Sequence, residues 1–322
     1  MDPLAGLLQD PRARGAFVLR CEFDPPWALR VQDEAPLSVV ALVRGGACLV
    51  PDGGGAHHLR AGDVAVVQGP QPYLVADAPT TPVQAVIHPG QRCTTPDGVQ
   101  VPLTWQGTRT WGGSREGATR LLTGTYRRPG EISRRLLSAL PRTVVVRAGP
   151  STDALVDWLS REVEREEPGQ DAVLDRLLDL LLVAVLRTWL ARPDVRAPGW
   201  YAAAGDPVVG PALRLLQSAP QRSWSVAALA AEVGTSRATL ARRFTDLVGE
   251  PPMAYLTSWR LDLAADLLRE PGATVAAVAR RVGYGSPFAL SAAFKRERGT
   301  SPSRYRAGRE EEPAGPAGSP GP

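Results

Sequence analysis

The feature that most constrains the fold is a pattern that occurs twice in the last third of the chain. Residues 225–244 and 274–294 each place a capping residue, an apolar helical face, a glycine, a second cap, a Leu and a Phe in the same order. Ser and Thr cap helices by accepting backbone hydrogen bonds, and glycine permits the positive φ of a tight turn. Each copy therefore predicts two helices joined by a tight turn, as in a helix-turn-helix unit. The aligned pairs are Ser225 with Thr274, Gly234 with Gly283, Ser236 with Ser286, Leu240 with Leu290, and Phe244 with Phe294.

The segment between the two copies predicts one long helix over 252–269, with apolar residues available to bridge both units. A helix of ~18 residues spans about 27 Å. That length would set the second helices of the two units close to one DNA turn apart, ~34 Å. Residues 206–306 contain 14 Lys/Arg and 8 Asp/Glu, a net +6, whereas the whole chain nets 37 − 33 = +4. A domain that holds all the excess positive charge is typical of a polyanion binder.

The end of this region carries a more specific signature, namely Val282-Gly283-Tyr284, Ser286, Phe294-Lys295-Arg296, Gly299 to Pro302 and Tyr305-Arg306. With Arg242, Phe244, Gly249 and Pro252 in the first half, residues 206–306 resemble the DNA-binding domain of the AraC/XylS family of regulators. The resemblance implies a transcription regulator that binds specific sequences in the major groove of double-stranded DNA and that is not an enzyme. It also makes RNA polymerase a candidate partner.

The candidate DNA-contacting residues lie on the second helix of each unit. The resemblance directs Ala238, Ala241 and Arg242 toward the groove. Because arginine can read guanine with two hydrogen bonds, Arg242 is the expected base reader; a solvated or phosphate-bound arginine is the alternative. The family often has arginine where Ala292 stands, so the second helix is expected to read bases weakly and to hold phosphates through Lys295 or Arg296. The full candidate set is Arg237, Ala238, Thr239, Ala241, Arg242, Arg243, Pro287, Phe288, Ser291, Ala292, Lys295 and Arg296.

The N-terminal half has a different character. Residues 37–76 read as short β segments separated by Gly and Pro clusters, which predicts a small antiparallel barrel or jelly roll. Gly62-Asp63 predicts a hairpin turn between two of these strands, and 118–126 and 143–147 predict further strands. The motifs Met1 to Leu4, Gly15 to Phe17 and Ala61 to Asp63, up to about Pro89, are similar to cupin-type sensor domains in a subset of the family. This similarity implies an unknown small-molecule effector or a stress signal.

Two helices are expected after the strands. Ala154, Leu155, Trp158, Leu159 and Val163 predict the buried face of the first, and 173–190 is apolar on most sides. Such a helix is buried in its own domain or paired with a second subunit, and the two can coexist. The resemblance implies that the helices after Ser151 form the dimerisation segment, so a homodimer is expected. The resulting fold class is an α+β multidomain protein: a cupin-like β-barrel with trailing helices, then an all-α domain with two helix-turn-helix units joined by a long helix. The predicted divisions are a sensor and dimerisation domain at 1–195, a linker at 196–206, the DNA-binding domain at 207–307 and a disordered tail at 308–322.

Two other function classes remain as alternatives, a cupin-type metalloenzyme (isomerase or oxygenase) and a non-regulatory architectural DNA-binding protein. The adjacent His57 and His58 would point to opposite faces of a strand. Tyr73 also stands where related sensor domains often place a histidine. No metal or cofactor is therefore expected.

The cysteines Cys21 and Cys93 flank the β region, and some cupin-type regulators of this family sense oxidants through thiols. They are candidate redox residues, with the small buried apolar side chain as the alternative. The longest apolar run, 177–186, is interrupted by Asp179 and is far shorter than the ~20 residues that a bilayer requires. With no leader pattern, the expected location is the cytoplasm, with no membrane partner.

Overall fold

The computed structural model describes residues 17–307 except 102–104, 108, 115, 127–136, 138–139, 196–197 and 271. The described residues form two compact units, one ending at 195 and the other beginning at 198. The predicted tail at 308–322 and the motif at Met1 to Leu4 lie outside the described residues. No helix among those described combines the length and the apolar character needed to cross a bilayer.

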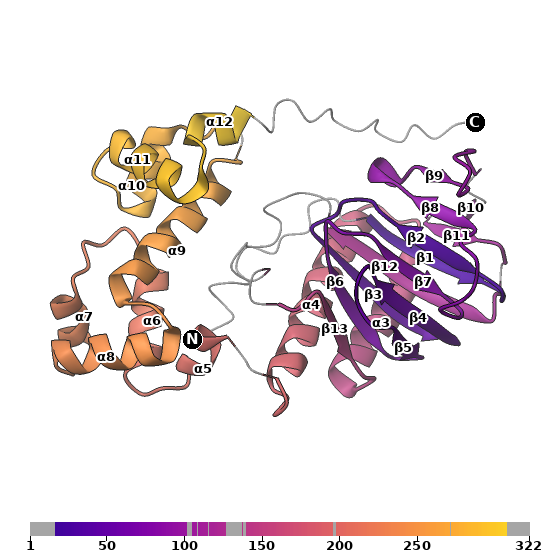
Figure 1. Cartoon of the computed structure of the whole chain (residues 1–322), viewed down its shortest axis with the longest axis horizontal. Coiled ribbons are helices and arrows are strands. Elements are labelled where there is room, and N and C mark those ends of the chain that lie inside the picture. Colours follow the sequence, from indigo (N-terminus) through magenta and orange to yellow (C-terminus); the bar gives the residue numbers. More distant parts are fainter. Residues whose placement is uncertain are drawn as a thin grey trace. The chain divides into compact units, whose positions relative to one another are not determined.

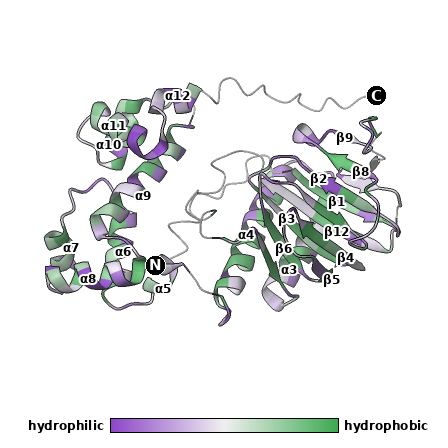
Figure 2. Cartoon of the chain, viewed as in Figure 1, coloured by the Kyte–Doolittle hydropathy of each residue, from purple (hydrophilic) through white to green (hydrophobic). Residues whose placement is uncertain are grey.

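The first unit consists mainly of two sheets that pack face to face (Figures 1 and 2). Apolar side chains from both sheets meet in a common core, to which Leu19, Leu42, Leu49 and Tyr73 belong. The seven-stranded sheet has the order β10 (Trp105–Gly107), β11 (Thr110–Gly112), β1 (Phe17–Phe23), β12 (Thr119–Tyr126), β3 (Leu37–Arg44), β6 (Val64–Gln68) and β13 (Thr143–Val146). The six-stranded sheet has the order β5 (His57–Arg60), β4 (Gly46–Pro51), β7 (Tyr73–Ala76), β2 (Ala28–Val31), β8 (Ala85–Ile87) and β9 (Cys93–Thr94).

The five strands predicted between 37 and 76 are all present, but the hairpin prediction at Gly62-Asp63 is wrong. β5 pairs with β4 in one sheet, whereas β6 pairs with β3 in the other. The turn therefore carries the chain from one sheet to the other. Gly62 has a φ of +88°, and the buried Asp63 carboxylate accepts hydrogen bonds from the Arg60 amide at 2.9 Å and the Ala148 amide at 3.1 Å. The bond from Ala148, 85 residues away, holds the crossing in place.

Helices α3 (Pro150–Val163) and α4 (Gln170–Leu190) pack against each other and against the seven-stranded sheet. Gly124 of β12 makes this approach possible, because a Cβ there would lie 2.3 Å from a methyl group of Leu178. The predicted face of α3 is partly wrong: Leu159 and Val163 are buried, but Trp158 is 49% exposed. Val156 takes the inward position instead, since 156, 159 and 163 satisfy the helical period equally well.

In α4 most of the apolar surface is buried within the unit. This agrees with the first of the two alternatives, burial of the helix in its own domain. The buried leucines include Leu174, Leu178 and Leu182, while Leu180 remains 51% exposed. Pairing of this helix with a second subunit stays a prediction.

The second unit is helical, and residues predicted as a linker contribute to it. Within 196–206, the short helix α5 contacts α8 and its Trp200 is buried, because an aromatic residue in this Gly- and Ala-rich stretch gains by packing. Helix α9 has 16 residues instead of the 18 predicted and ends at Leu267. The helices are α5 (Gly199–Ala203), α6 (Val209–Ser218), α7 (Val226–Glu232), α8 (Arg237–Val248), α9 (Pro252–Leu267), α10 (Val275–Val282), α11 (Pro287–Arg298) and α12 (Pro302–Ala307).

Two helix pairs are present, α7 with α8 and α10 with α11. α8 and α10 contact α9, α7 and α8 contact α6, and α11 contacts α12. Phe244 of α8 meets Tyr255 of α9 edge-on, with ring centroids 5.7 Å apart. Phe294 of α11 meets Tyr305 of α12 in the same manner at 5.3 Å. The buried Leu and Phe of each pair thus anchor α8 and α11 to the rest of the unit.

Candidate nucleic-acid interface

Both helix pairs begin and turn where the sequence predicts. Four side-chain oxygens cap the four helices by accepting the backbone amide three residues later. Gly234 and Gly283, in the turns, have φ values of +70° and +86°. The caps are Ser225 to Ala228 at 3.1 Å, Ser236 to Thr239 at 3.1 Å, Thr274 to Ala277 at 3.2 Å and Ser286 to Ala289 at 3.1 Å. The capping predictions are therefore confirmed.

The inward side of α8 fixes which residues face outward. Leu240 and Phe244 are fully buried, and successive residues of a helix are rotated by ~100°. Arg242 is then about 180° from the midline of this buried face, with Ala238 beside it, and both are exposed. Thr239 and Ala241 are half-buried. Arg242 therefore lies on the most outward line of the helix.

The same construction applies to α11, 50 positions later. Leu290 and Phe294 are fully buried, which directs Ala292 outward where α8 has Arg242. Phe288 takes the place of Ala238, and the residue is 83% exposed. Among the large apolar residues that the structure describes, Phe288 is the most exposed. Pro287, Ala292, Lys295 and Arg296 are exposed and Ser291 is half-buried.

Contacts distinguish the two neighbouring arginines of α8. Among the described residues, the Arg242 side chain makes no hydrogen bond or ion pair. Arg243 instead donates to the Asp206 carboxylate from Nη2 at 2.7 Å and from Nε at 3.0 Å. The same carboxylate accepts the amides of Val208 and Val209 at the start of α6, both at 2.9 Å. Arg243 thus holds α8 to the beginning of α6.

The environment of Asp206 favours its charged form. Partial burial alone would raise the pKa of this carboxyl, but the hydrogen bonds from Arg243, Val209 and Val208 outweigh it, so the pKa is lowered from its usual value. A comparable ion pair removes Arg298 of α11 from the exposed cations, because it is bound to Asp262 of α9. Lys295 makes no such contact among the described residues.

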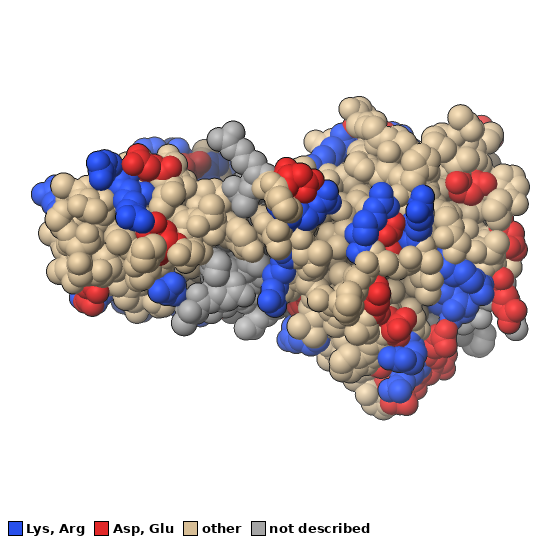
Figure 3. Space-filling model, turned by 90° about the horizontal axis from the view of Figure 1, so that it is seen from below, with Lys and Arg blue, Asp and Glu red and all other residues tan. Residues whose placement is uncertain are grey.

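The first unit, which comprises the described residues up to 195 and is called the β unit below, distributes its charged side chains differently from the helical unit. On the face drawn in Figure 3, basic and acidic side chains alternate over this unit, at the right of the view. The buried Glu22, for example, accepts from Arg20 Nε at 2.7 Å and from Arg120 Nε at 2.9 Å. Pairs of this kind neutralise part of the positive charge of the unit.

The three cysteines are free thiols and all are buried. Burial raises the pKa of Cys21 to about 12, although a hydrogen bond with Thr123 opposes the shift. Burial also raises the pKa of Cys93. Because the thiolate is the reactive form, these thiols lack the activation typical of a redox sensor. A redox role for Cys21 and Cys93 stays a prediction.

The histidines do not converge. His57 is half-buried and His58 exposed on β5, while His88 contacts Gln32 at 3.2 Å and Thr94 at 2.8 Å. In the part of the chain that the structure describes, no three His, Cys, Asp or Glu side chains are grouped as metal ligands.

Comparisons with known proteins agree with this division of the chain. A family model described as Cupin matches residues 2–191, and one described as a helix-turn-helix domain matches residues 229–308. A relative in Streptomyces antibioticus, named as an AraC-like transcription regulator, is 43% identical over 175 residues, which cover 53% of this chain and 58% of the relative. The chain thus spans less than two thirds of that relative's length.

Another relative aligns over nearly the whole chain. An uncharacterized HTH-type transcriptional regulator of Haemophilus influenzae is 27% identical over 315 residues, or 95% of this chain and 98% of the relative. Among solved structures, the DNA-binding domain of AdpA, a global transcriptional factor, in complex with a target DNA, is 37% identical. It covers 34% of this chain and 100% of that chain, with a TM-score of 0.32.

Proposed function

The chain belongs to the cupin family and carries an AraC-type helix-turn-helix domain, and from this premise we propose that it regulates transcription by binding specific DNA sequences. The observation that carries the proposal is the construction of α8 and α11, which are capped and anchored on one side and exposed on the other. A helix held in this way can enter the major groove without losing internal contacts.

In this proposal α7–α8 and α10–α11 are two helix-turn-helix units joined by α9, with α8 and α11 as the recognition helices. The 16 residues of α9 correspond to a rise of about 24 Å at ~1.5 Å per residue. Together with the width of the two helices, this length is compatible with successive major grooves on one face of DNA, ~34 Å apart. The domain boundaries inferred from the sequence, 1–195 and 207–307, fit the same proposal.

Arg242 is the proposed base reader, since its guanidinium is exposed, has no described partner and can donate two parallel hydrogen bonds to guanine. Ala238 and Ala241 would offer methyl contacts to thymine, and Arg237 and Thr239 lie near the capped end of α8, where backbone amides favour phosphate. Arg243, the remaining candidate of α8, is paired with Asp206, so we propose that it positions the helix and contacts the DNA backbone at most.

On α11 we propose that the groove side consists of Pro287, Phe288, Ser291 and Ala292, with Lys295 and Arg296 on phosphates. None of the four groove-side residues carries a charge, so this helix would contribute position and shape more than base hydrogen bonds. The proposal extends to a homodimer formed through the β unit, a small-molecule effector, contact with RNA polymerase and a cytoplasmic location.

The test begins by mapping bound sites across the genome in deletion and complemented strains. Binding of the purified full chain to a mapped site is then measured by fluorescence anisotropy against random DNA of equal length and salt. A regulator should prefer its site by about 10³-fold or more. Equal affinity for random DNA would leave an architectural protein, and stoichiometric iron, zinc or manganese in the purified protein would favour a metalloenzyme.

A further inference from the structure

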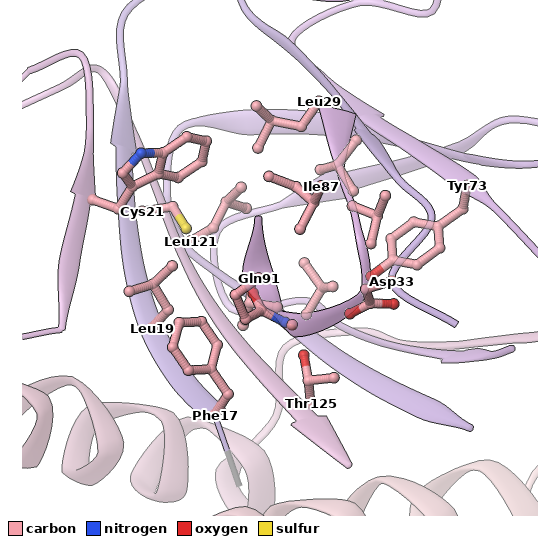
Figure 4. A pocket seen from close by; sticks show the side chains of 16 residues that line it. Phe17, Leu19, Cys21, Leu29, Asp33, Tyr73, Ile87, Gln91, Leu121 and Thr125 are labelled. Carbon is pink, nitrogen blue, oxygen red and sulfur yellow. The ribbon is translucent and has the colours of Figure 1, made fainter. Parts of the chain in front are cut away.

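The chain contains five phenylalanines, and four of them pack inside the protein or point into its interior. Phe23, Phe244 and Phe294 are buried, and Phe17 points into a cavity of about 270 Å³ between the two sheets of the β unit (Figure 4). Phe288 is the exception, since the residue is 83% exposed and its ring stacks on no other described aromatic ring. Exposure alone does not call for a partner, because single apolar residues occur on many protein surfaces. The position of this ring on α11 is what identifies its partner.

Phe288 is the second residue of α11 and lies on the side of the helix that faces away from its buried residues. The residues three and four positions later, Ser291 and Ala292, are small, so no long side chain covers the ring from that direction. Lys295, seven positions later, lies on nearly the same line of the helix, about 10 Å farther along its axis, and is exposed. The outward side of α11 therefore runs from an apolar ring, across small residues, to a cation.

This order of side chains matches the major groove of DNA. A recognition helix brings its N-terminal residues closest to the base edges, and Phe288 stands in the first turn of α11. Lys295, two turns later, can then bind a phosphate of the strand that borders the groove. A phenyl ring has no hydrogen-bond donor or acceptor. Among the groups that bases expose in the major groove, only the 5-methyl group of thymine is therefore complementary to it.

Insertion between base pairs is another way in which phenylalanine contacts DNA, but it is a device of proteins that bind the minor groove. We propose that Phe288 packs against the 5-methyl group of a thymine and so makes α11 specific for an A·T pair. This role rests on the proposed function and deepens it, because it gives base specificity to a helix whose groove side carries no charge. With Arg242 on guanine, bound sites should contain a G·C pair under α8 and an A·T pair under α11, about 34 Å apart.

The test is fluorescence anisotropy of the full chain on a mapped site in which thymines are replaced one at a time by deoxyuridine. This replacement removes the methyl group and keeps the base pair. We expect one or two replacements to weaken binding about fourfold each, the equivalent of ~0.8 kcal/mol for one buried methyl group. Phe288→Ala should weaken binding to the unmodified site by about fourfold or more and should abolish the response at those positions. Thymines that α8 contacts should keep their response in this variant.

Two further variants make the result specific to the apolar contact. Phe288→Leu keeps an apolar side chain at the position, so it should retain part of the response to deoxyuridine. Val99→Ala shortens a residue of the β unit that is 65% exposed, and this matched control should bind the unmodified and modified sites as the wild type does. Circular dichroism checks the fold of each variant.

The proposal is overturned if no thymine responds in the wild type, or if folded Phe288→Ala responds to deoxyuridine as the wild type does. It is also overturned if Phe288→Ala binds the unmodified site as tightly as the wild type. In each of these cases a wild type that still prefers its site to random DNA keeps the proposed function and loses only the role of Phe288. Equal affinity of the wild type for the site and for random DNA would remove both.

Discussion

The neighbouring arginines 242 and 243 of α8 offer a sharp test of the interface, because their contacts assign them opposite roles. Arg242→Ala removes an exposed guanidinium that has no described partner. The folded state loses no contact, so the free energy of unfolding should change by less than about 0.5 kcal/mol. If the guanidinium reads guanine, the loss is ~1–3 kcal/mol of discrimination, or roughly 5- to 150-fold in the ratio of specific to nonspecific affinity.

Arg243→Ala should act on stability instead. The Arg243 side chain is 45% exposed and that of Asp206 only 11%, so solvent screens this ion pair in part. Its loss should cost about 0.5–1 kcal/mol, or roughly 2–5 °C in the melting temperature of a domain of ~100 residues. Asp206 would keep its bonds to the α6 amides, so the fold should survive and the specificity ratio should stay within about twofold.

Both effects are measured on the same proteins. Urea unfolding followed by circular dichroism gives the stability, and fluorescence anisotropy with a mapped site and random DNA gives the ratio. Arg161→Ala, which removes an exposed arginine of α3, is the matched control for lost positive charge. The reasoning is refuted if Arg243→Ala lowers the ratio at unchanged stability, or if Arg242→Ala leaves the ratio intact.

Further predictions follow from the same contacts. The pKa of Asp206 is lowered in the folded state, so its contribution to the free energy of unfolding is fully present above the unfolded-state pKa of ~3.9 and is lost as the pH falls through the folded-state pKa. The urea midpoints at pH 7 and pH 3 should therefore differ less in Asp206→Asn than in the wild type. Phe294→Ala should cost about 3–5 kcal/mol because the ring is fully buried, whereas Phe288→Ala should leave the urea midpoint nearly unchanged and weaken binding to the mapped site. Sedimentation equilibrium should find a dimer for the full chain and a monomer for 198–307, and Leu180→Glu should dissociate the dimer if α4 forms its seam; a monomeric full chain at tens of micromolar would exclude that role.

Local signals made the helical unit predictable from sequence. A cap, a glycine turn and a Leu-Phe pair act within about ten residues, and each produces the predicted hydrogen bond, φ or buried side chain. The strands of 37–76 were equally accessible, since Gly and Pro clusters separate them. Strands β1 and β2 were missed, because the charged residues Arg20, Glu22 and Arg30 interrupt their apolar runs.

Long-range contacts account for the failures. The turn at Gly62 has the residues of a hairpin, but Asp63 is bonded to Arg147 and Ala148, some 85 residues away, and these contacts place β5 and β6 in different sheets. In α3 two overlapping apolar sets satisfy the helical period, and only the sheet decides between them. The ion pair of Arg243 was also not predicted, because its partner, Asp206, is 37 residues distant; contact of Arg243 with DNA stays a prediction. Local pattern cannot reveal an interaction of this kind.

The two helix pairs also show how a repeated scaffold can acquire unequal functions. Residues that fix the fold are the same in both: Leu240 and Leu290, and Phe244 and Phe294, occupy matching buried positions. The outward positions differ, with arginine and alanine at 242 and 292 and alanine and phenylalanine at 238 and 288. Packing restrains the first set and leaves the second free, because exposed substitutions cost little stability. Base discrimination should therefore be concentrated at the base pairs that α8 contacts. Helix α11 exposes the ring of Phe288 and the cations Lys295 and Arg296, so it should contact thymine methyl groups and backbone phosphates.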